Sequence, residues 1–478
     1  MSGGREQPID LTVSFVDRGD AFAVLLEGAG ESAEREVALQ DLTAVGTDLE
    51  RLRGGEDLTP VGAEATSAGG AARGGSELAR LGQRLFSCIF EGADLALFVR
   101  AADTARREQR PLRLFVKLAH GSPLERIPWE ILHDGHRFIA KEARCAVVRY
   151  LYDRQEVPSF QVAAPLRVLV TSACPPPHSP LNLEVEIEAI LEAYRGAERL
   201  VCPVVQRNVS LDQLEDLWRG AELRRKPFHV WHHCGHGHYT QGGGEPRFLL
   251  SLERRGVAEY VNVDQLSEVV GACPELRLAV LNVCHSGSPV GLVPELARLN
   301  VPVVIGYGSA VANDLAYKFA AALHQALLHI PVELAVSLAR RALARHSVMA
   351  LEWSLPLLFS RRSDWGPILR WPVARETAAA QARRSPRTVT VEVNGVKAGG
   401  DVIVSGTEEA GAARHSSLPD RVRVKASQIS ARGSVDVAGV RRVGGFSEGE
   451  MRLREQRMEE LLRELATRFS RGESQHER

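Results

Sequence analysis

The sequence has almost no net charge, no long hydrophobic run and no signal-peptide pattern. Its 59 Lys and Arg residues are balanced by 60 Asp and Glu residues, which leaves a net charge of −1. Neutralising phosphates requires a surplus of basic residues, so we expect no direct binding to nucleic acid. No run reaches the roughly 18 apolar residues that span a bilayer, and the opening MSGGREQPID lacks an apolar stretch. These absences predict a protein of the cytoplasm with no membrane partner.

Several common motifs are also missing. The sequence contains no G-x-x-x-x-G-K-[ST], no G-x-G-x-x-G after a strand and no G-x-S-x-G between residues 151 and 365, which argues against a P-loop ATPase, a dinucleotide site and an α/β-hydrolase elbow. The cysteines do not form the pattern of a disulfide scaffold, because they are scattered and odd in number. They are Cys88, Cys145, Cys174, Cys202, Cys234, Cys273 and Cys284. Such a set in a long chain favours free thiols in a reducing compartment.

The middle of the chain alternates short apolar runs with amphipathic segments. LRVLVTSA (166–173) is typical of a buried parallel strand, and further apolar runs lie at 227–233, 277–283 and 301–305. Helical patterns occur near 183–196, 211–222, 263–271, 292–299, 312–328 and 331–346. This alternation predicts a parallel sheet covered by helices on both faces. We assign residues 151–365 to one α/β domain.

Two smaller segments precede this domain. Residues 1–60 are β-rich, because alternation at Leu11, Val13 and Phe15 leads into a turn at Asp17–Asp20 and a second apolar run, which predicts a hairpin. Residues 60–76 are rich in Gly and Ala without periodicity and predict a flexible loop. Helical patterns and the strand-like LRLFVKL follow in 77–150, which we interpret as a prodomain-like segment.

The end of the chain differs in kind from the rest. Residues 375–388 are typical of a linker, and 389–446 contain two related copies, VNGVKAGGDVIVSG and ASQISARGSVDVAG, at a constant offset of 33 residues. Each copy predicts short strands bounded by turns, which pair either with each other or with a partner chain. Residues 447–470 predict an amphipathic helix, whose start has capping-box spacing. Self-assembly through 389–470 is one interpretation of this region, and a small β appendage is the other.

Two strand-like runs end in residues that can perform chemistry. FHVWHHCGHG ends at Gly235, His236 and Gly237, and LAVLNVCHSG ends at Cys284. Ligands bind outside the carboxyl ends of strands in open α/β sheets, so the two side chains should meet there if their strands are neighbours. The spacing of 48 residues is close to the roughly 50 residues between the histidine and the cysteine of a caspase-type dyad.

The chemistry of a cysteine protease requires both groups. A thiol is mostly protonated at neutral pH, and a nearby imidazole both generates the thiolate and protonates the leaving amine. The backbone N–H groups of Gly237 and Cys284 are the candidate donors to the oxyanion. The substrate pocket is poorly specified. Asn313 and Asp314 are candidates for it, although Asp314 could instead cap the helix that starts near 312–315.

These segments resemble the CHAT group of caspase-like cysteine peptidases. The resemblance covers about 80–365 and includes FHVWHHCGHG, LAVLNVCHSG, LRVLVTSACPPP, the helix with Glu186 and Glu188, VPVVIGYGSAVANDLAYKFAAALHQAL, EWSLPLLF and the upstream IPWEILHDG. It implies a caspase-hemoglobinase fold and endopeptidase activity, with His236 as base and Cys284 as nucleophile. Tyr307 stands where such proteins often carry an aromatic residue near the substrate cleft. Val283 departs from the more usual alanine, and His285 is a second candidate for the base.

Such peptidases usually act in signalling or defence and are switched on by a sensor. We therefore expect a regulated bacterial effector that cleaves a specific protein substrate and responds to a regulatory protein encoded nearby. The alternative is a catalytically inactive scaffold that recruits partners through its C-terminal module. A third reading is a metal-binding regulator built on the histidines of 229–238. We expect no metal or other cofactor, because alternation sends His232 and His233 to opposite faces and no second Cys/His pair is evident.

Overall fold

The structure, a computed structural model, describes most of the chain up to residue 370 and short strands beyond it. The described ranges are 7–54, 68–119, 121–151, 157–240, 248–271, 273–288, 291–299, 301–346, 351–362 and 364–370, followed by separate strands between 388 and 443. The chain divides into two units, Met1–Pro372 and Val373–Arg478. Within the described ranges, no helix combines the length and the apolar character needed to cross a membrane.

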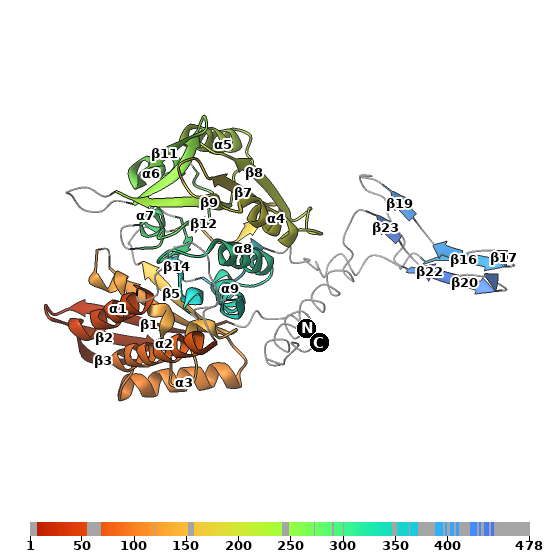
Figure 1. The fold of residues 1–478 in the computed structure, drawn as a ribbon. Helices are drawn as coiled ribbons and strands as arrows, with labels where there is room; N and C mark the ends of the chain where they lie inside the picture. Colours follow the sequence, from red (N-terminus) through yellow and green to blue (C-terminus); the bar gives the residue numbers. More distant parts are fainter. Residues whose placement is uncertain are drawn as a thin grey trace. The chain divides into compact units, whose positions relative to one another are not determined.

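One sheet of 13 strands forms the frame of the first unit (Figure 1). Its strands are β1 (Ile9–Asp17), β2 (Ala21–Gly28), β3 (Glu31–Ala38), β4 (Leu112–Leu118), β5 (Cys145–Leu151), β7 (Leu166–Ala173), β8 (Val201–Arg207), β9 (Val230–Tyr239), β10 (Phe248–Arg254), β11 (Val257–Val261), β12 (Leu278–Asn282), β13 (Val303–Tyr307) and β14 (Pro356–Ser360). A separate two-stranded sheet joins β6 (Val162–Ala163) to β15 (Leu369–Arg370).

The strand order places β9 and β12 side by side in the middle of the sheet. The path runs β11-β10-β9-β12-β13-β14-β5-β4-β1-β2-β3, and β7 pairs with both β8 and β9. The pairs β8–β7, β7–β9, β9–β12 and β12–β13 are all parallel. The sheet is therefore mostly parallel around β9, and antiparallel pairs lie toward its ends and at β13–β14.

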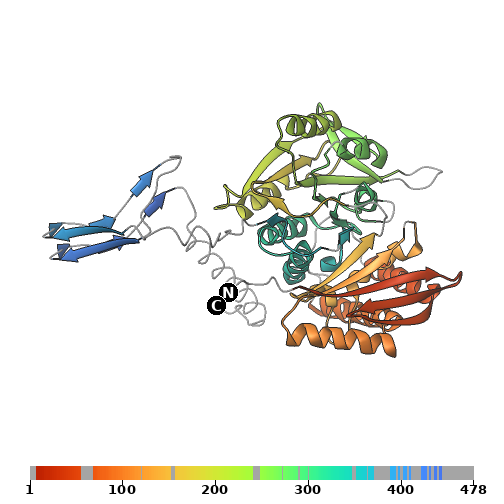
Figure 2. The same ribbon diagram turned by 180° about the vertical axis from the view of Figure 1, so that it is seen from behind.

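Helices cover both faces of the sheet, as predicted. They are α1 (Leu39–Gly54), α2 (Ala68–Ile89), α3 (Ala93–Arg107), α4 (Leu183–Ala193), α5 (Leu211–Leu223), α6 (Val263–Gly271), α7 (Leu292–Arg298), α8 (Asn313–Leu327) and α9 (Val332–His346), with short 3-10 turns at Pro123–Arg126, Trp129–Ile131, Ile139–Lys141 and Glu352–Ser354. Successive residues of β9 contact helices on opposite faces of the sheet. Trp231 packs edge-on against Trp218 of α5, whereas His232 bonds to Glu186 of α4 and His324 of α8. The predicted α/β class is thereby confirmed (Figure 2).

The N-terminal hairpin belongs to the same sheet as the α/β core. β1 and β2 pair antiparallel around the predicted turn, where the N–H of Arg18 donates to Ala21 O, and β1 then pairs parallel with β4. The prediction of a loop at 60–76 is wrong for its second half, because α2 (Ala68–Ile89) begins at Ala68. The stretch lacks apolar periodicity but is rich in alanine, and its helical backbone continues into an amphipathic segment that packs. Residues 55–67 lie outside the described ranges.

In the second unit, the two sequence copies pair with each other. The strands of the first copy are β16 (Thr388–Asn394), β17 (Lys397–Ala398), β18 (Val402–Ser405) and β19 (Glu408–Ala410), and those of the second are β20 (Arg421–Ser427), β21 (Ser430–Ala431), β22 (Val435–Ala438) and β23 (Arg441–Val443). Each strand pairs in parallel with the strand 33 residues further on, as in Thr388↔Arg421 and Val402↔Val435. The predicted helix at 447–470 and nearly all of the linker at 375–388 lie outside the described residues.

Candidate active site

His236 lies three residues before the end of β9, and Cys284 lies two residues beyond the end of the neighbouring parallel strand β12. The register pairs Cys234 with Asn282, and each candidate residue follows two positions later. Gly237 confirms the close approach, because a Cβ at this position would lie 2.7 Å from the carbonyl oxygen of Cys284. It would also lie 2.4 Å from the ring of Phe248. Only glycine fits here, so the Gly of the His-Gly motif lets the two strand ends pack together.

The His236 ring is oriented by the loop between β7 and α4. Its Nε2 lies 2.9 Å from the carbonyl oxygen of Ser179, so Nε2 carries a proton and donates it. In the neutral ring this leaves Nδ1 as the basic nitrogen. The ring of His178 stacks on that of His236, with 4.8 Å between ring centroids and 26° between planes. Neither contact was predicted from the sequence, because both join residues of a loop without periodicity to the end of a distant strand.

The Cys284 thiol is held by the loop that follows β13. The N–H of Val311 donates to Sγ at 3.5 Å, and the thiol donates to Val311 O at 3.8 Å. Burial raises the pKa of Cys284 above its usual value, although the Val311 N–H opposes this shift. Within the part of the chain that the structure describes, no hydrogen bond joins Sγ to His236. The arrangement is that of a resting, protonated thiol beside its candidate base.

Ser286 fixes the turn after Cys284. Its hydroxyl is buried, donates to Leu281 O at 3.0 Å and accepts the N–H of Tyr307 at 3.1 Å, so it ties the ends of β12 and β13 together. His285 adopts a left-handed backbone, with φ of 60°, and its N–H donates to Ser309 O. Burial and the positive charge of Arg53 lower the pKa of His285. A proton is therefore harder to place on His285 than on an exposed histidine.

Cys174 lies beside the candidate dyad, as its place at the end of the first core strand predicts. Its Sγ is 3.6 Å from His236 Nε2 and donates to Ser179 O at 3.4 Å. Cys174 thus approaches the same ring nitrogen that bonds to Ser179, not the nitrogen left free as a base. This geometry makes Cys174 a neighbour of the site and a useful control for Cys284.

The three residues predicted near the substrate pocket occupy different environments. Tyr307 ends β13 and is buried, and burial together with the charges of Glu186, Cys284 and Cys234 raises the pKa of its phenol. Asn313 begins α8, and Asp314 lies in the first turn with 64% of its side chain exposed, 3.6 Å from Lys318. A carboxylate in a first helical turn is favourable to the helix by itself. A role for Asn313 or Asp314 in substrate specificity stays a prediction.

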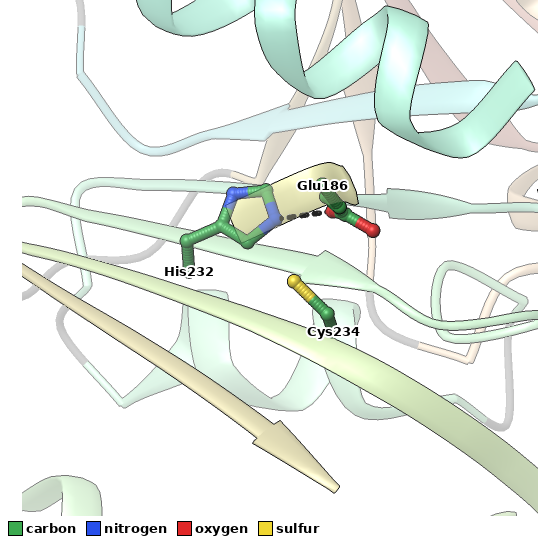
Figure 3. A group of neighbouring side chains, drawn as sticks. All are labelled: Glu186, His232 and Cys234. Atoms are coloured by element: carbon green, nitrogen blue, oxygen red, sulfur yellow. Dashed lines mark hydrogen bonds and ion pairs between the residues drawn. The ribbon is translucent and has the colours of Figure 1, made fainter. Parts of the chain in front are cut away.

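A buried polar cluster beneath the dyad was not predicted from the sequence. Glu186, His232 and Cys234 direct their polar atoms toward one another (Figure 3), and His232 Nε2 lies 2.8 Å from Glu186 Oε1. Asn282 also donates to Glu186 Oε1. The parity of β9 and β12 places His232, Cys234 and Asn282 on one face, but nothing local in the sequence brings Glu186 of α4 to them.

A comparison with protein-family models identifies the family of this chain. The CHAT domain profile matches residues 79–370, more than half of the chain. No curated protein matches. Solved structures with a similar arrangement include the Saccharomyces cerevisiae separase–securin complex (11% identity, TM-score 0.39, 76% of this chain and 30% of that one) and the Drosophila initiator caspase Dronc (11%, 0.32, 44% and 85%).

A third is a secreted C11 cysteine protease from Bacteroides thetaiotaomicron, bound to an irreversible peptide inhibitor (13% identity, TM-score 0.29, 37% of this chain and 57% of that one). The chain therefore spans less than a third of the separase chain and under two thirds of the C11 protease chain. These likenesses are distant in both sequence and geometry. The match to the CHAT domain model over residues 79–370 shows that the chain belongs to the CHAT domain family.

Proposed function

We propose that the protein is a cysteine endopeptidase in which Cys284 is the nucleophile and His236 the base. The observation that carries the proposal is the register of β9 and β12, which brings both residues to the same edge of the sheet, two positions beyond a Cys234–Asn282 pair. The ring orientation set by Ser179 O supports it, since that contact leaves Nδ1 of His236 free to accept a proton. The peptidase fold class of the family is consistent with this chemistry.

The reaction would proceed through an acyl-enzyme. His236 takes the thiol proton, and the Cys284 thiolate attacks the scissile carbonyl carbon. The backbone N–H groups of Gly237 and Cys284 donate to the oxyanion of the tetrahedral intermediate. Collapse of that intermediate breaks the C–N bond, and the His236 imidazolium protonates the leaving amine. A water molecule, deprotonated by His236, then hydrolyses the thioester and restores the thiol.

The resting geometry supports a regulated enzyme. The thiol is half-buried under the loop containing Val311, its pKa is raised, and no described hydrogen bond links it to His236. Activation would then consist of a loop rearrangement that brings Sγ and Nδ1 into contact. A protein substrate and a sensor encoded nearby, acting in bacterial signalling or defence, are the partners that we propose for this switch.

Co-expression with candidate proteins encoded nearby tests the proposal. Wild type should release discrete fragments once its sensor is triggered, and Cys284→Ala should release none. Cys174→Ala is the matched control, because it removes a thiol that is 3.6 Å from His236 without touching the proposed nucleophile. His236→Ala should abolish cleavage, and His285→Ala should not. Cleavage by Cys284→Ala would refute the assignment, whereas a wild type that cleaves nothing when triggered would favour a scaffold built on the same fold.

A further inference from the structure

The polar cluster of Glu186, His232 and Cys234 has the composition of a metal site. The three ligand atoms come from two elements, α4 and β9, and lie within 4.8 Å of one another (Figure 3). All three side chains are buried: Glu186 is 3% exposed, and His232 and Cys234 are 0% exposed. Carboxylate oxygen, imidazole nitrogen and thiolate sulfur are the three donors that zinc takes from proteins.

We propose that Glu186, His232 and Cys234 bind one zinc ion in the interior of the domain. Buried charges are normally paired or coordinate a metal. When bound as a carboxylate and a thiolate, Glu186 and Cys234 bring two negative charges, which one Zn²⁺ balances. In a tetrahedral zinc site the ligand atoms lie about 3.3–3.8 Å apart, given bond lengths of about 2.0–2.3 Å. His232 Nε2 and Glu186 Oε1 lie 2.8 Å apart, so binding the ion would require these two atoms to move apart by about 0.5–1 Å.

The surroundings of His232 match those of a metal-binding histidine. Its second ring nitrogen, Nδ1, lies 2.8 Å from Nε2 of His324, and Nδ1 of His324 lies 2.6 Å from the hydroxyl of Tyr194. His232 can therefore bind the ion through Nε2 and donate its Nδ1–H to His324, which in turn donates to Tyr194. Metal-binding histidines usually donate their second N–H in this way, since that bond fixes both the tautomer and the ring orientation.

Two neutral oxygens near the cluster have no partner in the described part of the chain. The amide of Asn282 donates to Glu186 and to Ala316 O, but its Oδ1 accepts no hydrogen bond although the residue is only 5% exposed. The hydroxyl of Tyr307, which is 1% exposed, is also without a partner. A buried polar atom left unpaired is costly, and a missing ion or water is a common reason. Asn282 Oδ1, held beside Glu186, is the fourth ligand that we favour.

A metal was not expected from the sequence, because no second Cys/His pair accompanies the histidines of 229–238. The structure supplies the missing ligand from α4 as a carboxylate. Bound there, the ion would fasten α4 to β9 two residues before His236. With Asn282 as fourth ligand, it would also fasten β12 two residues before Cys284. The ion would therefore keep β9 and β12, which carry the candidate dyad, in register without contacting substrate.

Metal analysis of the purified full chain tests the proposal without any need for proteolysis. Protein grown with added zinc should retain about one zinc per chain after dialysis, and Cys234→Ser and Glu186→Gln should lose most of it. Two matched controls should keep wild-type zinc: Glu188→Gln changes an exposed carboxylate on α4, and Cys273→Ser changes a buried thiol elsewhere.

Cobalt gives a second readout, and its first arm uses wild type alone and so does not depend on how any variant folds. Refolding wild type with Co²⁺ should produce the intense visible bands of a tetrahedral site and a thiolate-to-cobalt charge-transfer band in the near ultraviolet. The charge-transfer band should be lost in Cys234→Ser and kept in Cys273→Ser. Wild type without zinc and without the cobalt bands would overturn the proposal and identify the cluster as a hydrogen-bond network. Zinc retained by both Cys234→Ser and Glu186→Gln would overturn it as well.

Discussion

Two thiols lie near His236, and their surroundings differ in a way that can be measured. Cys174 approaches His236 Nε2, the nitrogen that donates to Ser179 O, whereas Cys284 receives an N–H from Val311 and lies where the β9–β12 register brings it beside His236. The resting state of Cys284 follows from burial, which disfavours the charged thiolate. The two thiols can therefore be distinguished by the pH at which each reacts.

The pH dependence of alkylation should report this resting state. Because burial raises the pKa of Cys284, its thiol stays protonated at neutral pH, and its alkylation rate should still be rising when the pH passes the usual cysteine value. Iodoacetamide labelling followed by mass spectrometry of the Cys284 peptide measures the rate. The same peptide in urea is the control, since there the thiol has an ordinary pKa and its curve should lie at lower pH. A folded-state rate that has already reached its plateau at pH 7 would contradict the raised pKa.

At the scale of elements, much of the core was predictable because its signals are local. The run LRVLVTSA predicted a strand at 166–173, and β7 spans Leu166–Ala173. α5, α6 and α9 match their predicted ranges to within a residue or so. β8 (Val201–Arg207) was not predicted, because an edge strand that contains a proline and is only partly buried lacks a clear alternation.

The candidate site was predictable only in part, for the same physical reason. His236 and Cys284 follow apolar runs, and glycine comes directly after His236 and His-Ser-Gly after Cys284, so the local sequence points to them. Ser179 acts through a backbone carbonyl, which any residue type could supply. Glu186 acts through contacts with residues 46 and 96 positions away in the chain. Contacts of this kind depend on how α4 packs on the sheet, which periodicity does not specify.

The contact between the β9 and β12 ends predicts that Gly237→Ala is severely disruptive. The added Cβ would meet the Cys284 carbonyl and the Phe248 ring, so the nucleophile turn must shift. Overpacking of this type costs about 1–3 kcal/mol of stability, and a displacement of about 1 Å in the site lowers activity by about 100-fold. Fragment release in the co-expression assay and urea unfolding measure the two effects.

Gly271→Ala is the control for that substitution. Gly271 ends α6, and a Cβ there meets nothing within 4 Å, so activity should be unchanged and stability equal or slightly higher. If Gly237→Ala cleaved at the wild-type rate, the close approach of the two strand ends would not be needed for catalysis.

At the scale of the whole molecule, the two units differ in how they can be stabilised. The first has a sheet with helices packed on both faces and a continuous hydrophobic core. The described strands of the second form four separate two-stranded sheets, each joining one copy to the other. A stack of two repeats is shorter than the three or more that usually form a stable array. Among the described residues of this unit, each strand pairs with one other strand, so one hydrogen-bonding edge of each strand has no described partner.

These open edges lead to a prediction about assembly. Since each parallel pair can accept another strand on either side, a second copy of the chain can extend the stack, and full-length protein should self-associate as its concentration rises. Light scattering coupled to size-exclusion chromatography should show this for the full chain, and not for a variant that ends at Pro372. The shorter chain should melt within about 2 °C of the first unit's transition in the full protein, because the residues that form the hydrophobic core of the first unit all lie within that unit. A full chain that stays monomeric at every concentration would assign residues 389–470 to a different partner, and a truncated chain that still associates would place the contact on the first unit.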